Sequence, residues 1–261
     1  MPVSYELIDN HYQTQNAPAM INLHPNCLTC NVRDCALMKH CERELLASVQ
    51  SYKHQYHFRK GENIFREGDP VRGVHFVQSG LVKQELNGTK GRPFILKLAN
   101  QGQPMGHRSA VSAVPQPYSA TAVEDSRVCF IELDFFRNLL RKSEGMRQEM
   151  DRILLREIGE AEHRLLGVAH QTVREKIANV LLHLASVYHY QEAGPGIKVQ
   201  IDRQEMADMA GTTKEQVSKI LAQFTREKII RFRAKHFKYL NLSVLKRIAD
   251  KEMAEAEAIC A

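Results

Sequence analysis

The sequence lacks the marks of membrane-spanning, secreted and catalytic proteins. No stretch approaches the roughly 18 consecutive apolar residues that a membrane-spanning helix needs, so we expect no membrane partner. Residues 1–22 contain no basic segment followed by an apolar core, which argues against a secretory signal and favours a cytoplasmic protein. A nucleophile elbow, a phosphate-binding loop and a zinc-protease helix motif are also missing. We therefore do not expect an enzyme.

The composition is that of a soluble globular protein with an unevenly charged chain. Its 261 residues, 43% hydrophobic and 25% charged, suffice for two domains of ordinary size. Residues 170–247 contain fourteen Lys or Arg and seven Asp or Glu, a surplus of +7 that leaves about −1 for the rest of the chain. This basic C-terminal third favours a module that binds a polyanion, although a merely solvated basic surface would have the same charge.

Short alternating runs, separated by glycine turns, fill much of the first half of the chain. Several strands at this spacing predict an all-β roll or barrel. The expected strands cover residues 54–58, 63–65, 74–78, 81–86, 94–98, 121–123 and 128–132. We expect short helices at 42–49 and 134–140, on either side of this block.

A long helix is expected from about residue 144 to residue 169, where no proline interrupts the pattern. Its apolar residues are spaced 4, 3, 4 and 3 apart, as in the seam of a two-stranded coiled coil. The seam consists of Leu154, Ile158, Ala161, Leu165 and Val168. The alternative is a helix that packs against its own domain, but Glu and Arg crowd the other faces. We therefore expect a homodimer.

The basic C-terminal third has the pattern of a winged helix-turn-helix. Helices are expected at 203–210 and from 212 or 213 to 228, separated by Gly211, and a β-hairpin wing at 229–232 and 237–242. The outer face of the second helix would enter the major groove of a double-stranded DNA operator. Base contacts are expected from Thr213, Lys214, Glu215, Ser218 and Lys219, and phosphate contacts from Thr212, Lys235 and Lys238. The alternative is a module that contacts only protein.

Three blocks of this sequence resemble the cyclic-AMP receptor protein and fumarate-nitrate reductase regulator (CRP/FNR) superfamily. They are KGENIFREGDP at 60–70, VHFVQSGLVK at 74–83 and the motif at 203–228, and the resemblance spans about 27–245. It implies an α+β protein with an N-terminal β-roll of the cyclic-nucleotide-binding type (a double-stranded jelly roll), a long dimerisation helix and a C-terminal winged helix-turn-helix. It further implies a transcription regulator that binds DNA as a homodimer and contacts RNA polymerase.

The expected parts follow from this resemblance. They are a cysteine-containing segment at 1–45, an effector-sensing β-roll at 46–143, the dimerisation helix at 144–169, the DNA-binding domain at 170–247 and a tail at 248–261. In the family's motif, Glu, Ser and Arg on the second helix read bases, and Glu215, Ser218 and Lys219 stand at these positions. Lys cannot form the bidentate fork of Arg, so we expect a relaxed or different operator at that base pair.

The resemblance does not favour a cyclic nucleotide as the effector. His107 stands where nucleotide binders of the family have the Glu that meets the ribose, and Tyr118 stands where they have the Arg that meets the phosphate. Arg108 is offset by one residue, which in a strand would turn its side chain to the other face. We therefore regard cyclic-nucleotide binding as unlikely.

Four of the six cysteines lie between residues 27 and 41. In a reducing cytosol, such clusters more often mark metal or redox chemistry than structural disulfides. Cys27 and Cys30 form C-x2-C, Cys35 follows after four residues and Cys41 after five more. Thiolates spaced in this way can converge on a soft metal centre. Zinc, or a thiol–disulfide switch without metal, remains an alternative.

The resemblance to the oxygen-sensing branch of the family makes this site more specific. That branch holds a [4Fe–4S] cluster with three N-terminal cysteines and one distant cysteine on a late strand of the roll. Cys129 matches the distant ligand, Cys27 and Cys30 match the first two, and Cys35 or Cys41 would be the third, with Cys35 favoured. The branch has C-x2-C-x5-C, from which this chain departs. The expected signal is oxygen or nitric oxide.

Two other readings stay open. One is a regulator of the same family that senses a small molecule or haem in the roll, with structural cysteines. The other is a metal-storage or redox protein whose basic domain binds nothing. Binding of the purified protein to an operator would exclude this second reading.

Overall fold

The computed structural model describes residues 19–20, 27–30, 32, 37–88, 91–233 and 235–249. The contacts divide the chain into two units, which are described in turn. The first comprises Met1–Lys83 and Ala99–Asp151, and the second comprises Gln84–Leu98 and Arg152–Ala261. Within the described residues, none of the helices combines the length and hydropathy needed to cross a membrane.

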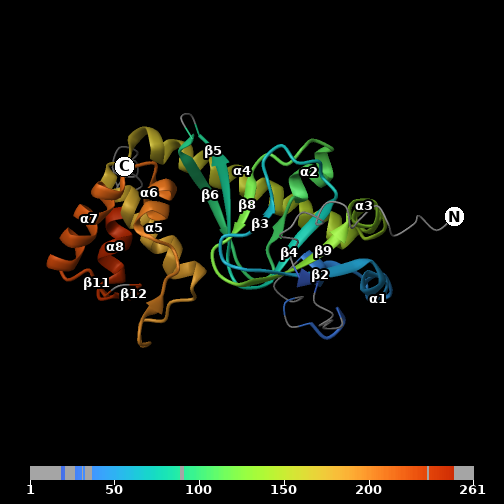
Figure 1. The fold of residues 1–261 in the computed structure, drawn as a ribbon. Helices are drawn as coiled ribbons and strands as arrows, with labels where there is room; N and C mark the ends of the chain where they lie inside the picture. Colours follow the sequence, from blue (N-terminus) through green and yellow to red (C-terminus); the bar gives the residue numbers. More distant parts are fainter. Residues whose placement is uncertain are drawn as a thin grey trace, which may run out of the picture. The chain divides into compact units, whose positions relative to one another are not determined.

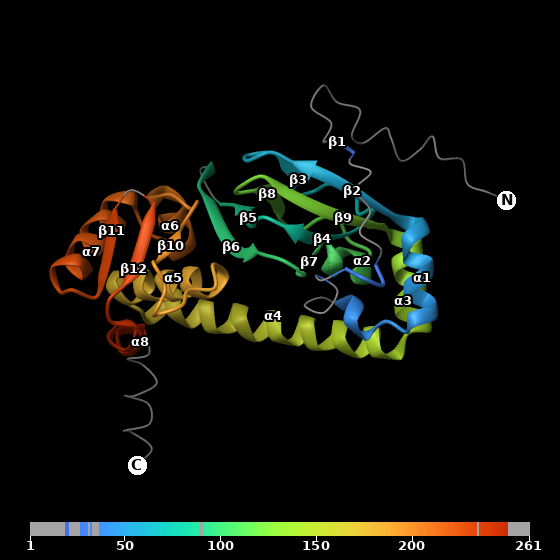
Figure 2. The same cartoon turned by 90° about the horizontal axis from the view of Figure 1, so that it is seen from below.

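The first unit is built on a five-stranded antiparallel sheet (Figure 2) with the order β1-β2-β9-β4-β7. Its strands are β1 (Ala19–Met20), β2 (Lys53–Phe58), β9 (Ser126–Glu132), β4 (Gly73–Ser79) and β7 (Pro104–Met105). In the ladders, Cys129 of β9 faces Gln55 on one side and Phe76 on the other. Strand β9 is therefore held by its neighbours along both edges.

A second sheet has the order β3-β8-β5-β6. Its strands are β3 (Asn63–Phe65), β8 (Ser119–Ala122), β5 (Val82–Asn87) and β6 (Pro93–Ala99). Glycine is required at the turn after β4, because Gly80 has φ +91° and a Cβ there would lie 2.4 Å from the Ser126 hydroxyl. The apolar side chains at the centre of the first unit are fully buried, among them Phe58, Val74, Val77, Val82 and Val128. The two sheets confirm the predicted roll.

Short helices complete the first unit: a 3-10 helix at Leu37–His40, α1 (Arg43–Tyr52), α2 (His107–Ser112) and α3 (Leu133–Lys142). Helices α1 and α3 meet where the rings of Tyr52 and Phe135 stack with centroids 4.1 Å apart. The strand geometry assumed for Arg108 is wrong, because this residue lies on α2.

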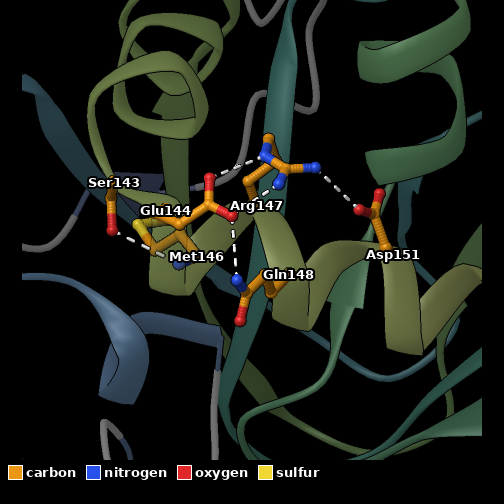
Figure 3. A network of polar contacts seen from close by, with 6 residues as sticks. All are labelled: Ser143, Glu144, Met146, Arg147, Gln148 and Asp151. Carbon is orange, nitrogen blue, oxygen red and sulfur yellow. Dashed lines mark hydrogen bonds and ion pairs between the residues drawn. The ribbon is translucent and has the colours of Figure 1, made fainter.

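Helix α4 (Glu144–His170) is 27 residues long and confirms the long helix predicted from the uninterrupted pattern. It begins at a cap, because the Ser143 hydroxyl accepts a hydrogen bond from the Met146 amide at 3.2 Å. Figure 3 shows how the first two turns are reinforced: the Arg147 guanidinium donates to Glu144 at 2.9 Å and to Asp151 at 3.1 Å. Exposed pairs of this kind contribute little individually.

The second unit contains the C-terminal helices and a small sheet (Figure 1). Its helices are α5 (Val173–Val187), α6 (Arg203–Ala210), α7 (Lys214–Arg226) and α8 (Leu242–Ala249), and its sheet has the order β10-β12-β11. The strands are β10 (Ile197–Lys198), β11 (Ile230–Arg233) and β12 (His236–Tyr239). The predicted wing extends to residue 242, whereas in the structure the side chain of Asn241 caps a helix there by accepting from the Val244 amide at 3.1 Å.

Candidate DNA-binding surface and cysteine-lined cavity

Local sequence determines the turn between α6 and α7. Asp202 and Glu205 form a reciprocal capping box at the start of α6, as their spacing predicts. Gly211 ends α6 in the left-handed region with φ +59°, which glycine adopts without strain. The Thr213 hydroxyl then caps α7 by accepting from the Gln216 amide at 3.3 Å. A helix, a tight turn and a second helix are thereby fixed within a few residues.

The predicted base-contacting residues lie on the outer side of α7. Thr213, Lys214, Glu215 and Lys219 are exposed and Ser218 is half-buried, whereas the opposite side, with Val217, Ile220, Leu221 and Phe224, is buried. Hydrogen bonds from its own backbone amide and from Thr213 lower the pKa of Glu215. This carboxylate is therefore ionised at neutral pH and can accept a hydrogen bond from a base.

The wing carries more positive charge than sequence analysis assigned to it. Lys235 and Lys238 are exposed as predicted, and Arg231 and Arg233 are exposed on the neighbouring strand. Arg231 lies directly opposite Lys238 in the ladder. Like charges in such a pair repel each other, which is tolerated when an anion lies against them. The alternation in β11 could have identified Arg231 and Arg233 once the hairpin register was known.

Helix α4 exposes an unusual number of apolar side chains. Of the nine large hydrophobic residues that are exposed in the described part of the chain, five lie on this helix: Leu155, Ile158, Leu165, Leu166 and Val168. Three of them belong to the predicted seam. Of the other two seam residues, Ala161 is exposed and Leu154 is half-buried. Leu155 and Leu166 were missed, because a strict 4-3-4-3 pattern selects a narrower stripe than the helix exposes. Exposed apolar groups at this density mark a surface for another protein.

Three of the predicted metal ligands line one cavity in the first unit. Cys27 and Cys30 from the N-terminal segment and Cys129 from β9 surround a space of about 60 Å³, which we call the thiol cavity. The rest of its wall consists of Val32, Met38, Val49, Lys53, Phe76, Val77, Gln78 and Ile131. The backbone amide of Cys27 donates to the side chain of Gln50 on α1 at 3.3 Å. Cysteines far apart in the sequence thus line one cavity at the wall of the roll.

Burial raises the pKa of two of the cysteines, Cys129 and Cys41. It raises the pKa of Cys129, an effect that a hydrogen bond from Gln55 and the charge of Lys53 oppose. Burial, the charge of Glu42 and the nearby Cys27 raise the pKa of Cys41 to about 11. Cys41 therefore stays a protonated thiol at neutral pH unless a metal displaces the proton.

The fourth ligand is not identified by the geometry. Cys35 lies outside the described residues, and Cys41 is buried but does not line the thiol cavity. Among the described side chains, no group of three or more His, Cys, Asp or Glu could hold a metal ion as they stand. The donor set itself suits a soft metal, because three thiols from two segments share one cavity.

The segment that was compared with the nucleotide-binding residues of the superfamily contains a buried aromatic residue. Tyr118 is fully buried, and its hydroxyl accepts a hydrogen bond from the Gly106 amide at 3.0 Å. The guanidinium carbon of Arg108 lies 5.1 Å from the centre of the Tyr118 ring, a cation–π contact. His107 is fully buried as well. A cation, Arg108, therefore lies beside Tyr118 although Arg itself is absent from position 118, and the expectation that a cyclic nucleotide is unlikely stays a prediction.

Comparison with known proteins decides the family. The description of a cyclic nucleotide-binding domain matches residues 55–143, and that of a Crp-like helix-turn-helix domain matches residues 175–248. The two matches are the two halves of one regulator, in the same order as the roll and the DNA-binding domain. The protein belongs to the CRP/FNR family of DNA-binding transcription regulators. It is not an enzyme.

Individual relatives of this CRP/FNR regulator are distant. It is 24% identical over 239 residues to the fumarate and nitrate reduction regulatory protein of Vibrio cholerae, covering 89% of this chain and 95% of that protein. It is 26% identical over 196 residues to the CRP-like cAMP-activated global transcriptional regulator of Mycobacterium tuberculosis, covering 74% of this chain and 87% of that protein. Both kinds of regulator are thus about equally similar.

Solved structures support the fold. The structure of FixK2 from Bradyrhizobium japonicum has a TM-score of 0.69 at 23% identity, covering 75% of this chain and 96% of that one. A CRP-family transcriptional regulator from Thermus thermophilus has a TM-score of 0.62 at 25% identity, covering 74% and 95%. Together with the two units, they confirm the predicted α+β architecture.

The end of the cysteine segment contacts the start of α4. The Ser143 hydroxyl donates to the carbonyl oxygen of His40 at 3.3 Å, and the His40 ring lies 3.7 Å from the Glu149 carboxylate. Gly145 leaves room for this approach, since a Cβ at its position would lie 2.6 Å from the His40 carbonyl oxygen. The first turns of α4 are therefore in direct contact with the residue that precedes Cys41.

Proposed function

We propose that this CRP/FNR regulator senses oxygen or nitric oxide through a [4Fe–4S] cluster held by Cys27, Cys30, Cys129 and either Cys35 or Cys41. The observation that carries the proposal is that Cys129, far along the chain from the other cysteines, lines the same cavity as Cys27 and Cys30. The spacing of the cysteines does not predict this convergence; it was predicted from the family resemblance.

When bound, such a cluster supplies a redox-active centre whose state depends on oxygen. The residues of this chain have separable roles around it. Cys129 is fixed by the two ladders of β9, whereas Cys27 and Cys30 belong to the N-terminal segment. Ligation by both groups ties that segment to the sheet. The same segment contacts α4 through His40, so its position is coupled to the start of the helix.

We further propose that α4 forms a homodimer through its exposed apolar side chains. The coupling through His40 would shift a monomer–dimer equilibrium, or the orientation of the dimer, according to the state of the cysteines. A dimer presents two copies of α7 to two half-sites of an operator. Base contacts would come from Thr213, Lys214, Glu215, Ser218 and Lys219, and phosphate contacts from Thr212, Lys235 and Lys238. RNA polymerase as a partner and a cytoplasmic location stay predictions from the sequence.

Anaerobic purification tests the proposal. We expect a brown protein with stoichiometric iron and sulfide whose colour bleaches in air. Cys129→Ser should abolish the colour, because a hard alkoxide replaces a soft thiolate poorly. Cys260→Ser is the matched control and should keep it. Replacing Cys35 and Cys41 separately should identify the remaining ligand, since only one of them is required.

Other outcomes would redirect the proposal. Colourless anaerobic protein with stoichiometric zinc would contradict the cluster and indicate a structural site. Metal-free protein whose operator binding changes with a disulfide would indicate a thiol switch in the same cavity.

A further inference from the structure

Two buried polar side chains accompany the thiols on the wall of the roll. Lys53 and Gln55 lie two residues apart on β2, so both point to the same side of the sheet. Gln55 lies directly opposite Cys129 in the antiparallel ladder, which places these two side chains on one face. Lys53 and Cys129 both line the thiol cavity.

The amide of Gln55 is aimed at the sulfur of Cys129. Its nitrogen donates to the Cys129 sulfur at 3.5 Å and to the Gln78 side-chain oxygen at 3.1 Å. Gln55 is only 1% exposed, and its carbonyl oxygen has no hydrogen-bond partner among the described residues. A buried amide that is only half satisfied is unfavourable for folding. Such a residue at this position calls for a role other than stability.

The charge of Lys53 also indicates a role other than stability. Lys53 is 6% exposed, although lysine is rarely buried to this extent. Thiolates that gather around a metal centre bring several negative charges into a poorly solvated cavity. A buried ammonium group and an N–H donor beside one of these sulfurs offset part of that charge.

We propose that Gln55, assisted by Lys53, positions Cys129 and tunes the metal centre that this cysteine helps to hold. The inference rests on the proposed function of the thiol cavity. The N–H of Gln55 fixes the orientation of the Cys129 side chain and draws electron density from its sulfur. Hydrogen bonds to ligating sulfurs and nearby positive charge raise the reduction potential of a cluster. Gln55 and Lys53 therefore make the cluster harder to oxidise and set the oxygen level at which the regulator responds.

The test compares the bleaching of anaerobic proteins after exposure to air. Gln55→Leu removes the donor at similar volume, and Lys53→Met removes the charge. Both variants should retain iron and sulfide, bleach several-fold faster than the original protein and show a lower midpoint potential. Lys53→Arg keeps the charge and should bleach at the rate of the original protein. Gln84→Leu is the matched control, because Gln84 is a buried amide on β5 that does not line the cavity.

Equal bleaching rates and potentials for Gln55→Leu and the original protein would overturn the inference, as would an equal change in Gln84→Leu. If the original protein holds no iron, the proposed cluster fails and the inference is tested separately with Co²⁺ and reduced, metal-free protein. Loss of a group that orients a ligand typically weakens metal binding by about 10-fold or more, so Gln55→Leu should bind Co²⁺ correspondingly more weakly. Equal affinities, or no Co²⁺ binding by the original protein, would refute it.

Discussion

At the scale of single residues, the proposed DNA-binding surface contains side chains that we expect to read bases and others that we expect to meet phosphates. Glu215 is exposed and ionised at the start of α7, and Lys238 is exposed on the wing. Phosphate contacts add affinity that does not depend on sequence, whereas base contacts supply discrimination. The two residues should therefore respond differently to truncation.

We expect Glu215→Ala to lose about 1–3 kcal/mol of discrimination at one base pair. Lys238→Ala should instead weaken binding to all sequences and lower the salt dependence by about one released ion. Binding of a library of operator variants at several salt concentrations measures both effects. A Glu215→Ala protein with unchanged preference at every position would show that α7 does not read bases through this residue.

Single residues also mark what sequence reasoning could reach. The capping box of Asp202 and the left-handed Gly211 were predictable, because each depends on a few neighbouring residues. The roles of Gln55 and Lys53 were not, because their relation to Cys129 exists only in the register of β2 against β9. Register is a property of paired strands, and no short turn joins β2 to β9 and fixes theirs within a local stretch of sequence.

At the scale of elements, two glycines on α4 provide a natural comparison. A Cβ at Gly145 would lie 2.6 Å from the His40 carbonyl oxygen, whereas a Cβ at Gly159 would meet nothing within 4 Å. Alanine stabilises a helix interior by roughly 0.5–1 kcal/mol relative to glycine. Any difference between the two substitutions therefore reports the contact between α4 and the cysteine segment.

We expect Gly159→Ala to raise the melting temperature and leave signalling intact. Gly145→Ala should lower stability by about 1–3 kcal/mol, because the neighbouring backbone must shift. It should also reduce the difference in operator binding between anaerobic and air-treated protein, while the iron content stays unchanged. Thermal unfolding and binding assays under both atmospheres measure these effects. If the two variants behaved alike, the contact between the cysteine segment and α4 would contribute to neither stability nor signalling.

Elements differed in how well they could be predicted. Long α4 and the helices flanking Gly211 have strong periodicity and caps, so their positions agreed with expectation. Short α2 and α8 were missed because six to eight residues carry little periodicity, whereas the equally short α6 was predicted from its capping box and Gly211. The missed α2 matters for function, because the orientation expected for the Arg108 side chain assumed a strand.

At the scale of the whole molecule, the proposed homodimer rests on the exposed apolar side chains of α4. Leu165 is 71% exposed in the single chain, so its replacement should leave the fold of that chain intact. We expect Leu165→Glu to yield monomers, because pairing would bury an uncompensated charge. Sedimentation should show the smaller species, and operator binding should fall since one half-site is lost. Unchanged dimers would show that the two chains pair elsewhere.

The order of the parts was predictable from the sequence, because the two domains have contrasting patterns and charge. The convergence of the cysteines was predictable only by resemblance, since their separation along the chain contains no geometric information. The positive charge of the wing was underestimated, because only the hairpin register shows that Arg231 and Arg233 lie opposite Lys238 and His236.

The position of Cys129 between two ladders has a consequence for engineering. Strand β9 cannot shift without breaking its pairing with both β2 and β4, so one half of the sensor is a fixed anchor shared with the scaffold. The other half would be the cysteines before α1, and the described residues among 27–41 pair with no strand of the sheet. Transplanting residues 27–41 from a regulator with another cysteine spacing should therefore exchange the chemistry of sensing while the roll, the long helix and the operator preference stay as they are.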